Sequence, residues 1–176
     1  ALLALKNNNL INPVLAIAPI TNWHRKNWPL NSYAKLINKL IENKANIKSV
    51  IILGSCNERE ECEDLKKKIK IKEVVNYAGK ANISEIYAIL RNCKMFIGND
   101  SGLMHLAAVS GIKTLGLFGP SKVENYSPWG DQAYFIRTTK TYDDLVLTKT
   151  YSRHDNSNLM ESLSVEKVYK KVLKII

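Results

Sequence analysis

The sequence predicts an α/β fold in three layers, in which a mainly parallel sheet is covered by helices on both faces. Apolar runs alternate along the 176-residue chain with segments of helical periodicity, which is typical of repeated β-α-β units. The first, second and fourth runs are apolar at nearly every position, as are strands that are buried on both faces. The chain length and the hydrophobic fraction of 45% are sufficient for one domain with a substantial core.

The elements of this fold can be assigned in order. Strands are predicted at residues 13–20, 48–55, 73–79, 94–98 and 113–118, with a further one at 132–138. Helices are predicted at residues 30–43, 57–69, 82–93 and 164–175, with a short one between the fourth and fifth strands. Ser164 is a typical N-cap for the last helix. The polar stretch 138–158 fits these patterns least well.

Three of the helices carry apolar residues on one face, which predicts the side that packs on the sheet. These residues are Tyr33, Leu36, Ile37, Leu40 and Ile41 in the first helix, Ile83, Ile86 and Leu90 in the third, and Leu103, Leu106 and Ala107 in the short one.

The composition restricts the partners that we expect. The net charge of +10 suits phosphorylated substrates, nucleic acid or an anionic membrane surface. The lysines are scattered, and no aromatic residues are interleaved with them for base stacking, so we expect no nucleic-acid binding. No apolar run predicts a transmembrane helix, and the first ten residues lack the basic start of a signal peptide. Cys56, Cys62 and Cys93 match no zinc-binding spacing and indicate reduced thiols in the cytoplasm.

Four loops follow predicted strands, and these loops should form the functional site. They span residues 21–29, 54–58, 98–102 and 119–130. Because parallel strands end at the same edge of a sheet, the loops should converge, and α/β proteins bind their ligands at that edge.

The turn Asp100-Ser101-Gly102 is the best candidate for binding an anion. The start of a helix leaves backbone N–H groups unpaired and carries a positive partial charge. Gly102 leaves room for a phosphate, Ser101 adds a hydroxyl, and His105 lies on the same helix face as Ser101. Asp100 repels phosphate and suits sugar hydroxyls or its own helix better. The alternative is an ordinary Asp or Ser N-cap followed by a surface histidine.

Two further loops offer charged side chains. The loop after the first strand contains His24, Arg25 and Lys26, and a cation here could neutralise a diphosphate leaving group. Its alternative is a solvated basic loop. Glu58 follows the second strand, where a carboxylate can accept both hydroxyls of a ribose. It could equally be the partner of a helix dipole in a first turn.

Several well-known motifs are absent from the sequence. No G-x-G-x-x-G follows the first strand, and Gly79-Lys80 lacks the P-loop spacing. Ser101 is off-centre for the G-x-S-x-G turn of hydrolases. No H-E-x-x-H or carboxylate–histidine cluster predicts a metal site.

Together these segments resemble the C-terminal half of glycosyltransferase family 9, the ADP-heptose:lipopolysaccharide heptosyltransferases. "GNDSGLMHLAAVSGIKTLGLFGPS" resembles the family's strongest motif almost throughout, and "HRKNWPLNSYAKL" resembles its Lys-x-Trp-Pro loop and the following helix. "IILGSCNERE", "NYAGKANISEIYAILRNCK" and "LMESLSVEKVYKKVL" fit in the same order. The similarity covers roughly residues 12–175. The sequence departs from the family at His24-Arg25, where small residues are frequent before the lysine.

The resemblance implies one half of a GT-B fold, which has two Rossmann-like domains with the active site in the cleft between them. Residues 1–11 would be a linker remnant, 12–138 the nucleotide-sugar-binding domain, and 139–176 a polar segment and a helix packed on that domain. Transferred by position, Lys26 would contact the donor phosphates, Glu58 the ribose, and Asp100 the sugar. Ser101, Gly102 and His105 would hold the diphosphate.

The implied reaction is inverting transfer of heptose from ADP-heptose to the lipopolysaccharide inner core, without a metal or cofactor. The acceptor site and the catalytic Asp base would lie in an N-terminal domain, so we expect no catalytic base in this chain. The protein would be cytoplasmic, and a peripheral contact with the anionic inner face of the inner membrane is left open. The alternatives are a non-catalytic nucleotide-sugar-binding module and a GT-B sugar-nucleotide epimerase, although Leu103 stands where epimerases usually have a second glycine.

Overall fold

The computed structural model describes residues 10–148 and 155–176, which form a six-stranded sheet whose neighbouring strands all run parallel. The strands are β1 (Val14–Ala18), β2 (Ser49–Ile52), β3 (Val74–Asn76), β4 (Met95–Asn99), β5 (Lys113–Phe118) and β6 (Ala133–Arg137). The helices are η1 (His24–Lys26), α2 (Leu30–Glu42), η2 (Cys56–Glu58), α3 (Arg59–Lys68), α4 (Ile83–Leu90), α5 (Gly102–Val109), α6 (Val123–Tyr126), α7 (Tyr142–Val146) and α8 (Val165–Ile175).

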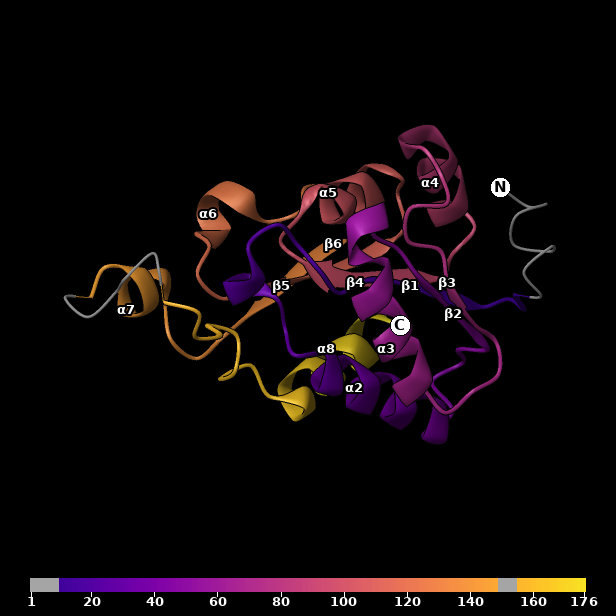
Figure 1. The fold of residues 1–176 in the computed structure, drawn as a ribbon, viewed down its shortest axis with the longest axis horizontal. Coiled ribbons are helices and arrows are strands. Elements are labelled where there is room, and N and C mark those ends of the chain that lie inside the picture. The colour runs from indigo at the N-terminus through magenta and orange to yellow at the C-terminus, as the bar shows by residue number, and fades with distance from the viewer. Residues whose placement is uncertain (1–9, 149–154) are drawn as a thin grey trace.

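Helices cover both faces of this sheet, which confirms the predicted three-layer fold. Figure 1 shows α2, α3 and α8 on one side of the strands and α4 and α5 on the other. Successive strand residues alternate between the two sides. In β1, Leu15 and Ile17 belong to the apolar cluster under α2, whereas Val14 and Ala16 belong to the cluster under α4 and α5.

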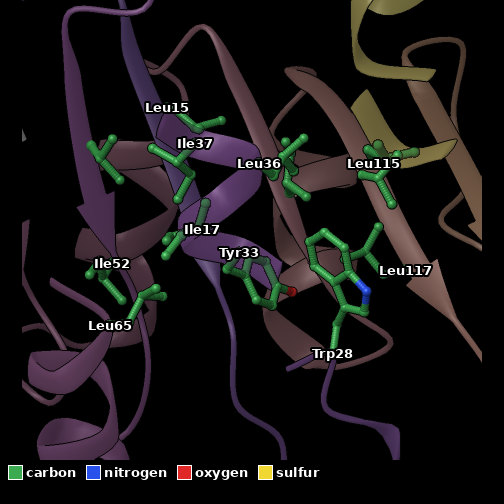
Figure 2. Packing of buried hydrophobic residues seen from close by; sticks show 14 of the residues in the cluster. Leu15, Ile17, Trp28, Tyr33, Leu36, Ile37, Ile52, Leu65, Leu115 and Leu117 are labelled. Atoms are coloured by element: carbon green, nitrogen blue, oxygen red, sulfur yellow. The ribbon is translucent and has the colours of Figure 1, made fainter. Parts of the chain in front are cut away.

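The larger core lies between the sheet and the layer of α2 and α8. The predicted apolar face of α2 is buried there, except that Ile41 is only partly buried. The indole ring of Trp28 meets the ring of Tyr33 edge to face with centroids 5.0 Å apart, and Figure 2 shows the pair beside Leu117 of β5. The end of the loop after β1, just before α2, is therefore part of the core.

Several predicted boundaries shift, each for a local reason. The charged helix α3 begins at Arg59 rather than residue 57, because Ser55 and Glu58 form a capping box around the short turn η2. Ser164 caps α8 as predicted, with its hydroxyl accepting from the N–H of Lys167 at 3.2 Å. The stretch 138–158 contains one short helix, α7, whose N-cap is Thr141. Residues 149–154 of that stretch and 1–9 of the predicted linker lie outside the described residues.

The strand order creates a crevice at one edge of the sheet. The order is β3-β2-β1-β4-β5-β6, so the connections that leave β1 and β4 run toward opposite ends of the sheet. Parallel sheets bind ligands at such a point, outside the carboxyl ends of the two central strands. Lys26 follows β1 and Asp100 follows β4, so the topology alone brings them to the same place.

None of the helices in residues 10–148 and 155–176 combines the length and the apolar character needed to cross a bilayer.

The last residue of β4 ties the two central strands together. The side-chain oxygen of Asn99 accepts from the N–H of Trp28 at 3.0 Å and from the hydroxyl of Tyr33 at 3.1 Å. Its amide group donates to the carbonyl of Pro19 at 2.6 Å. Burial raises the pKa of Tyr33, so this hydroxyl stays protonated and remains a donor. One fully buried amide thus fixes both ends of the loop after β1.

We predict that Asn99→Ala lowers the free energy of unfolding by about 2–4 kcal/mol, because it leaves buried donors and an acceptor without partners. Denaturant unfolding should show this as a lower midpoint. The control is Asn43→Ala, which removes an exposed amide bonded to the carbonyl of Lys39 at 2.8 Å and should change stability by about 0.5 kcal/mol or less. Equal losses for the two variants would contradict the role given to Asn99.

Candidate functional site

All six residues predicted from the sequence line one cleft at the carboxyl edge of the sheet. The cleft has a volume of about 1050 Å³ and lies over the ends of β1 to β4. The six residues are Lys26, Glu58, Asp100, Ser101, Gly102 and His105. A second hollow of about 590 Å³ continues from it toward the loops after β5 and β6, and five of the six residues line both. Those five form the centre of a longer groove, while Glu58 belongs to one end.

A lysine and an aspartate form the charged centre of the groove. The Nζ of Lys26 lies 3.2 Å from Oδ2 of Asp100, and both side chains are largely buried. An ammonium group has three donors, so this contact leaves others for a ligand. The pairing also reduces the repulsion between Asp100 and an anion, because Lys26 balances the negative charge of the aspartate. The solvated-loop alternative does not describe Lys26.

The turn that carries Lys26 is held by its own hydrogen bonds. The N–H of Lys26 donates to the carbonyl of Trp23 at 3.0 Å, and the N–H of Asn27 donates to the carbonyl of His24 at 3.0 Å. The hydroxyl of Thr21 donates to the side chain of Asn27 at 2.7 Å and closes the loop.

The start of α5 is not capped by the side chain of its own serine. Ser101 occupies the N-cap position, yet its side chain makes no capping bond. Its hydroxyl oxygen is buried and has no hydrogen-bond partner within the part of the chain that the structure describes. A Cβ on Gly102 would meet nothing within 4 Å, so the missing side chain leaves open space toward the cleft. His105 is exposed one turn further along.

Glu58 caps a turn and also lines the cleft. Its Oε2 accepts from the N–H of Ser55 at 2.7 Å, so it caps the turn η2. The same carboxylate lines the cleft and can offer lone pairs to a ligand. The neighbouring wall needs a glycine, because Gly79 has φ +66° and a Cβ there would lie 2.5 Å from the Cα of Cys56.

The apolar wall of the cleft was not predicted. Ile83 was expected on the buried face of its helix with Ile86 and Leu90, but its side chain is 71% exposed. Val109, the last residue of α5, is 73% exposed, and Ile83 and Val109 both line the cleft. In α5 Met104 and Ala107 are fully buried, whereas Leu103 and Leu106 are only partly buried: these two pack against the same core cluster and also line the cleft. The sequence carries no signal for this wall, because Ile83 has the spacing of a buried helix face.

The second hollow is polar and aromatic. It is lined by the loop after β5 and by α6 and α7, which contribute Pro120, Ser121, Lys122, Asn125, Tyr126 and Tyr142. The Nζ of Lys122 lies 5.0 Å from the ring centroid of Tyr142. The groove therefore has an apolar end, a charged centre and a polar end. None of the His, Cys, Asp and Glu side chains in residues 10–148 and 155–176 form a cluster of three or more that could hold a metal ion.

Known proteins are similar to this chain in sequence and in fold. Residues 3–153 match the profile of glycosyltransferase family 9 (heptosyltransferase). The chain is 33% identical over 129 residues to lipooligosaccharide heptosyltransferase 2 of Haemophilus influenzae, which covers 71% of this chain and 36% of that protein. It is 29% identical over 120 residues to lipopolysaccharide heptosyltransferase 2 of Escherichia coli K12, covering 66% and 34%. The chain thus spans about a third of the length of these curated relatives.

Solved structures agree with the fold. ADP-heptose lipopolysaccharide heptosyltransferase II of Escherichia coli superposes with a TM-score of 0.78 at 22% identity, over 98% of this chain and 50% of that one. An Escherichia coli heptosyltransferase with ADP gives a TM-score of 0.72 at 18% identity, over 93% and 44%. These likenesses confirm that the chain has the fold of one half of a GT-B glycosyltransferase. With the match over residues 3–153, they show that the chain belongs to glycosyltransferase family 9.

Proposed function

We propose that this chain is the donor-binding half of a heptosyltransferase and that its groove binds ADP-heptose. The observation that carries the proposal is the charged centre, where Lys26, the unpartnered hydroxyl of Ser101 and the open start of α5 meet at the crevice between β1 and β4. A helix start with free N–H groups and a nearby cation is suited to a diphosphate.

The nucleoside would occupy the apolar end of the groove. Glu58 is the acceptor for the ribose hydroxyls, since only one of its oxygens is needed to cap η2. Ile83, Leu106 and Val109 provide a surface on which a flat base can lie. ADP is the nucleotide that we infer, because a related Escherichia coli heptosyltransferase has been solved with ADP.

The sugar would then lie on the other side of the diphosphate, at the polar end. Asn125 and Ser121 can hydrogen-bond hydroxyl groups, and Tyr126 and Tyr142 offer aromatic faces and hydroxyls. Asp100 lies between the two ends and can accept from the sugar hydroxyl nearest the leaving group.

In the transfer, this half of the enzyme would stabilise the leaving group. Displacement breaks the bond between the anomeric carbon and the diphosphate oxygen, which leaves with the bonding electrons, while the acceptor hydroxyl oxygen bonds to that carbon and gives its proton to a base. Lys26 with the N-terminus of α5 would bind the ADP that departs. The acceptor is a hydroxyl of the lipopolysaccharide core, and the site that holds it, with the catalytic base, would be provided by protein outside this chain. We keep a cytoplasmic location, with the acceptor presented at the inner face of the inner membrane, as part of this proposal.

The first test is calorimetric titration of the chain with ADP, UDP, GDP and adenosine. We predict that ADP binds best and that Lys26→Ala weakens ADP about tenfold to a hundredfold while adenosine is little affected, because a charge-assisted hydrogen bond contributes about 1.5–3 kcal/mol. Lys39→Ala is the control, since Lys39 pairs with Glu166 on the far layer of helices. A preference for UDP would rule out the ADP assignment, and equal losses for ADP and adenosine would place Lys26 away from the diphosphate.

The second test uses a natural reporter in the wall of the cleft. Cys56 is exposed and lines the nucleoside end, whereas Cys62 and Cys93 are buried and burial raises the pKa of each thiol to about 12. We predict that N-ethylmaleimide modifies one thiol of the folded chain at neutral pH, that mass spectrometry locates it at Cys56, and that saturating ADP slows the reaction. Cys56→Ser should abolish labelling and keep ADP binding. Labelling that ADP leaves unchanged would place the nucleoside elsewhere.

The third test concerns the polar end. We predict that Asn125→Ala weakens ADP-heptose about threefold to tenfold, the value of one hydrogen bond, and leaves ADP unchanged. Asn92→Ala is the control, because the amide of Asn92 donates to the carbonyl of Ala88 at 2.8 Å on α4. If Asn125→Ala weakens ADP and ADP-heptose equally, the sugar does not occupy this hollow.

A further inference from the structure

The residue before Lys26 is an arginine that is almost completely buried. Arg25 is 2% exposed, although it lies in a surface loop and belongs to a residue type that is rarely buried without partners. A buried guanidinium must be paired and hydrogen-bonded, and its partners show what it does.

Those partners lie about 130 positions away, in the segment Asp155–Met160, which we call the strap. The Nε of Arg25 donates to the carbonyl of Ser157 at 3.0 Å, and its Nη2 donates to the hydroxyl of Ser157 at 3.1 Å. The same Nη2 lies 3.3 Å from Oδ2 of Asp155. Hydrogen bonds from Ser157 and the positive charge of Arg25 lower the pKa of Asp155, so the ion pair persists well into the acidic range.

The strap also donates hydrogen bonds to the backbone on both sides of Lys26. The N–H of Leu159 donates to the carbonyl of Arg25 at 2.9 Å. The amide of Asn158 donates to the carbonyl of Asn27 at 2.8 Å. Lys26 is thus the middle residue of a tripeptide whose two neighbours are bonded to the same distant segment.

The strap itself is fixed in the core. Met160 is completely buried, and a Cβ at Gly119 would lie 3.1 Å from the carbonyl oxygen of Leu159. Just beyond the strap, the carbonyl of Leu163 accepts from the indole N–H of Trp28 at 2.8 Å. The Lys26 turn is therefore attached, through the strap, to the end of β5 and to the larger core.

We propose that Arg25 is a positioning residue for diphosphate binding: by locking the Lys26 turn to the strap, it sets the position from which Lys26 contacts the ligand. This rests on the proposed binding of a nucleoside diphosphate. Arg25 acts through Lys26 and its backbone, since it does not line the cleft, whereas Lys26 does. The turn also has local hydrogen bonds and the Lys26–Asp100 ion pair, and to these the strap adds a bond to the backbone carbonyl on each side of Lys26.

Hydrogen exchange tests the mechanical part without any ligand. We expect Arg25→Met to speed exchange of the amides of Lys26 and Asn27 at least about tenfold, while the amides of β4 are unchanged. Asn158→Ala removes one bond of the strap and should have a smaller effect in the same direction. Lys167→Met is the control, because Lys167 donates to the carbonyl of Arg137 at 2.8 Å in the same C-terminal region but away from the turn. Unchanged exchange in both Arg25→Met and Asn158→Ala would overturn the proposal.

A double-mutant cycle tests the functional part. We expect Arg25→Met to weaken ADP about tenfold and adenosine little, and to cause no further loss in a Lys26→Ala background, because the effect passes through Lys26. A loss that is equal for ADP and adenosine, or that persists in full without Lys26, would overturn the positioning role. If Arg25→Met does not fold, the same cycle with Asn158→Ala decides the question. Failure of the unmutated chain to bind ADP would refute the proposed function, and the exchange experiment would still show whether the strap restrains the turn.

Discussion

The site depends on one buried amide. Asn99 sits at the end of β4, next to Asp100, and its side chain is bonded to the backbone of Pro19 and Trp28 at the two ends of the loop after β1. In a parallel sheet these two central strands are neighbours, but nothing in strand pairing fixes how their loops are placed beyond the edge. The Asn99 side chain connects the loop after β1 to the end of β4 in the interior, where an unpaired donor or acceptor destabilises the fold. The buried hydrogen bonds of Asn99 therefore determine how far Lys26 lies from Asp100.

The charged centre illustrates how an aspartate and an anion can share a site. Asp100 alone would repel a diphosphate, but its ion pair with Lys26 makes the pair neutral, and the N-terminus of α5 adds a partial positive charge. The aspartate also holds the end of a flexible side chain that would otherwise sample many rotamers. An ammonium restrained before the ligand arrives needs less ordering when it binds, so part of the cost of organising the site is met on folding.

The sequence predicts the fold and the polar half of the site well, for physical reasons. Parallel strands and helices have distinct periods, and residues that follow strands must meet at one edge, which is why Lys26, Glu58 and Ser101 could be placed together in advance. The apolar wall could not be predicted, because Ile83 fits the pattern of a buried helix face and only the packing of α4 beside α5 shows that it is left exposed. The role of Asn99 could not be predicted either, because no sequence pattern indicates which groups a polar residue at the end of a strand will bond.

The strap is the part of the site that sequence reasoning was least able to reach. Its contacts with Arg25 join residues 130 or more positions apart, and its polar composition resembles that of a solvated loop. The Arg25 guanidinium is buried, whereas the Asp155 side chain is 48% exposed. This ion pair is a poor source of stability, because solvent screens the carboxylate and the desolvation of Arg25 offsets the attraction. Its value in our proposal is geometric: the guanidinium of Arg25 donates to acceptors at fixed positions in the strap, and these bonds set the position of the turn. The loop after β1 can thus be long enough to reach over the crevice and still hold its lysine in one place, which is what electrostatic stabilisation of a leaving group requires.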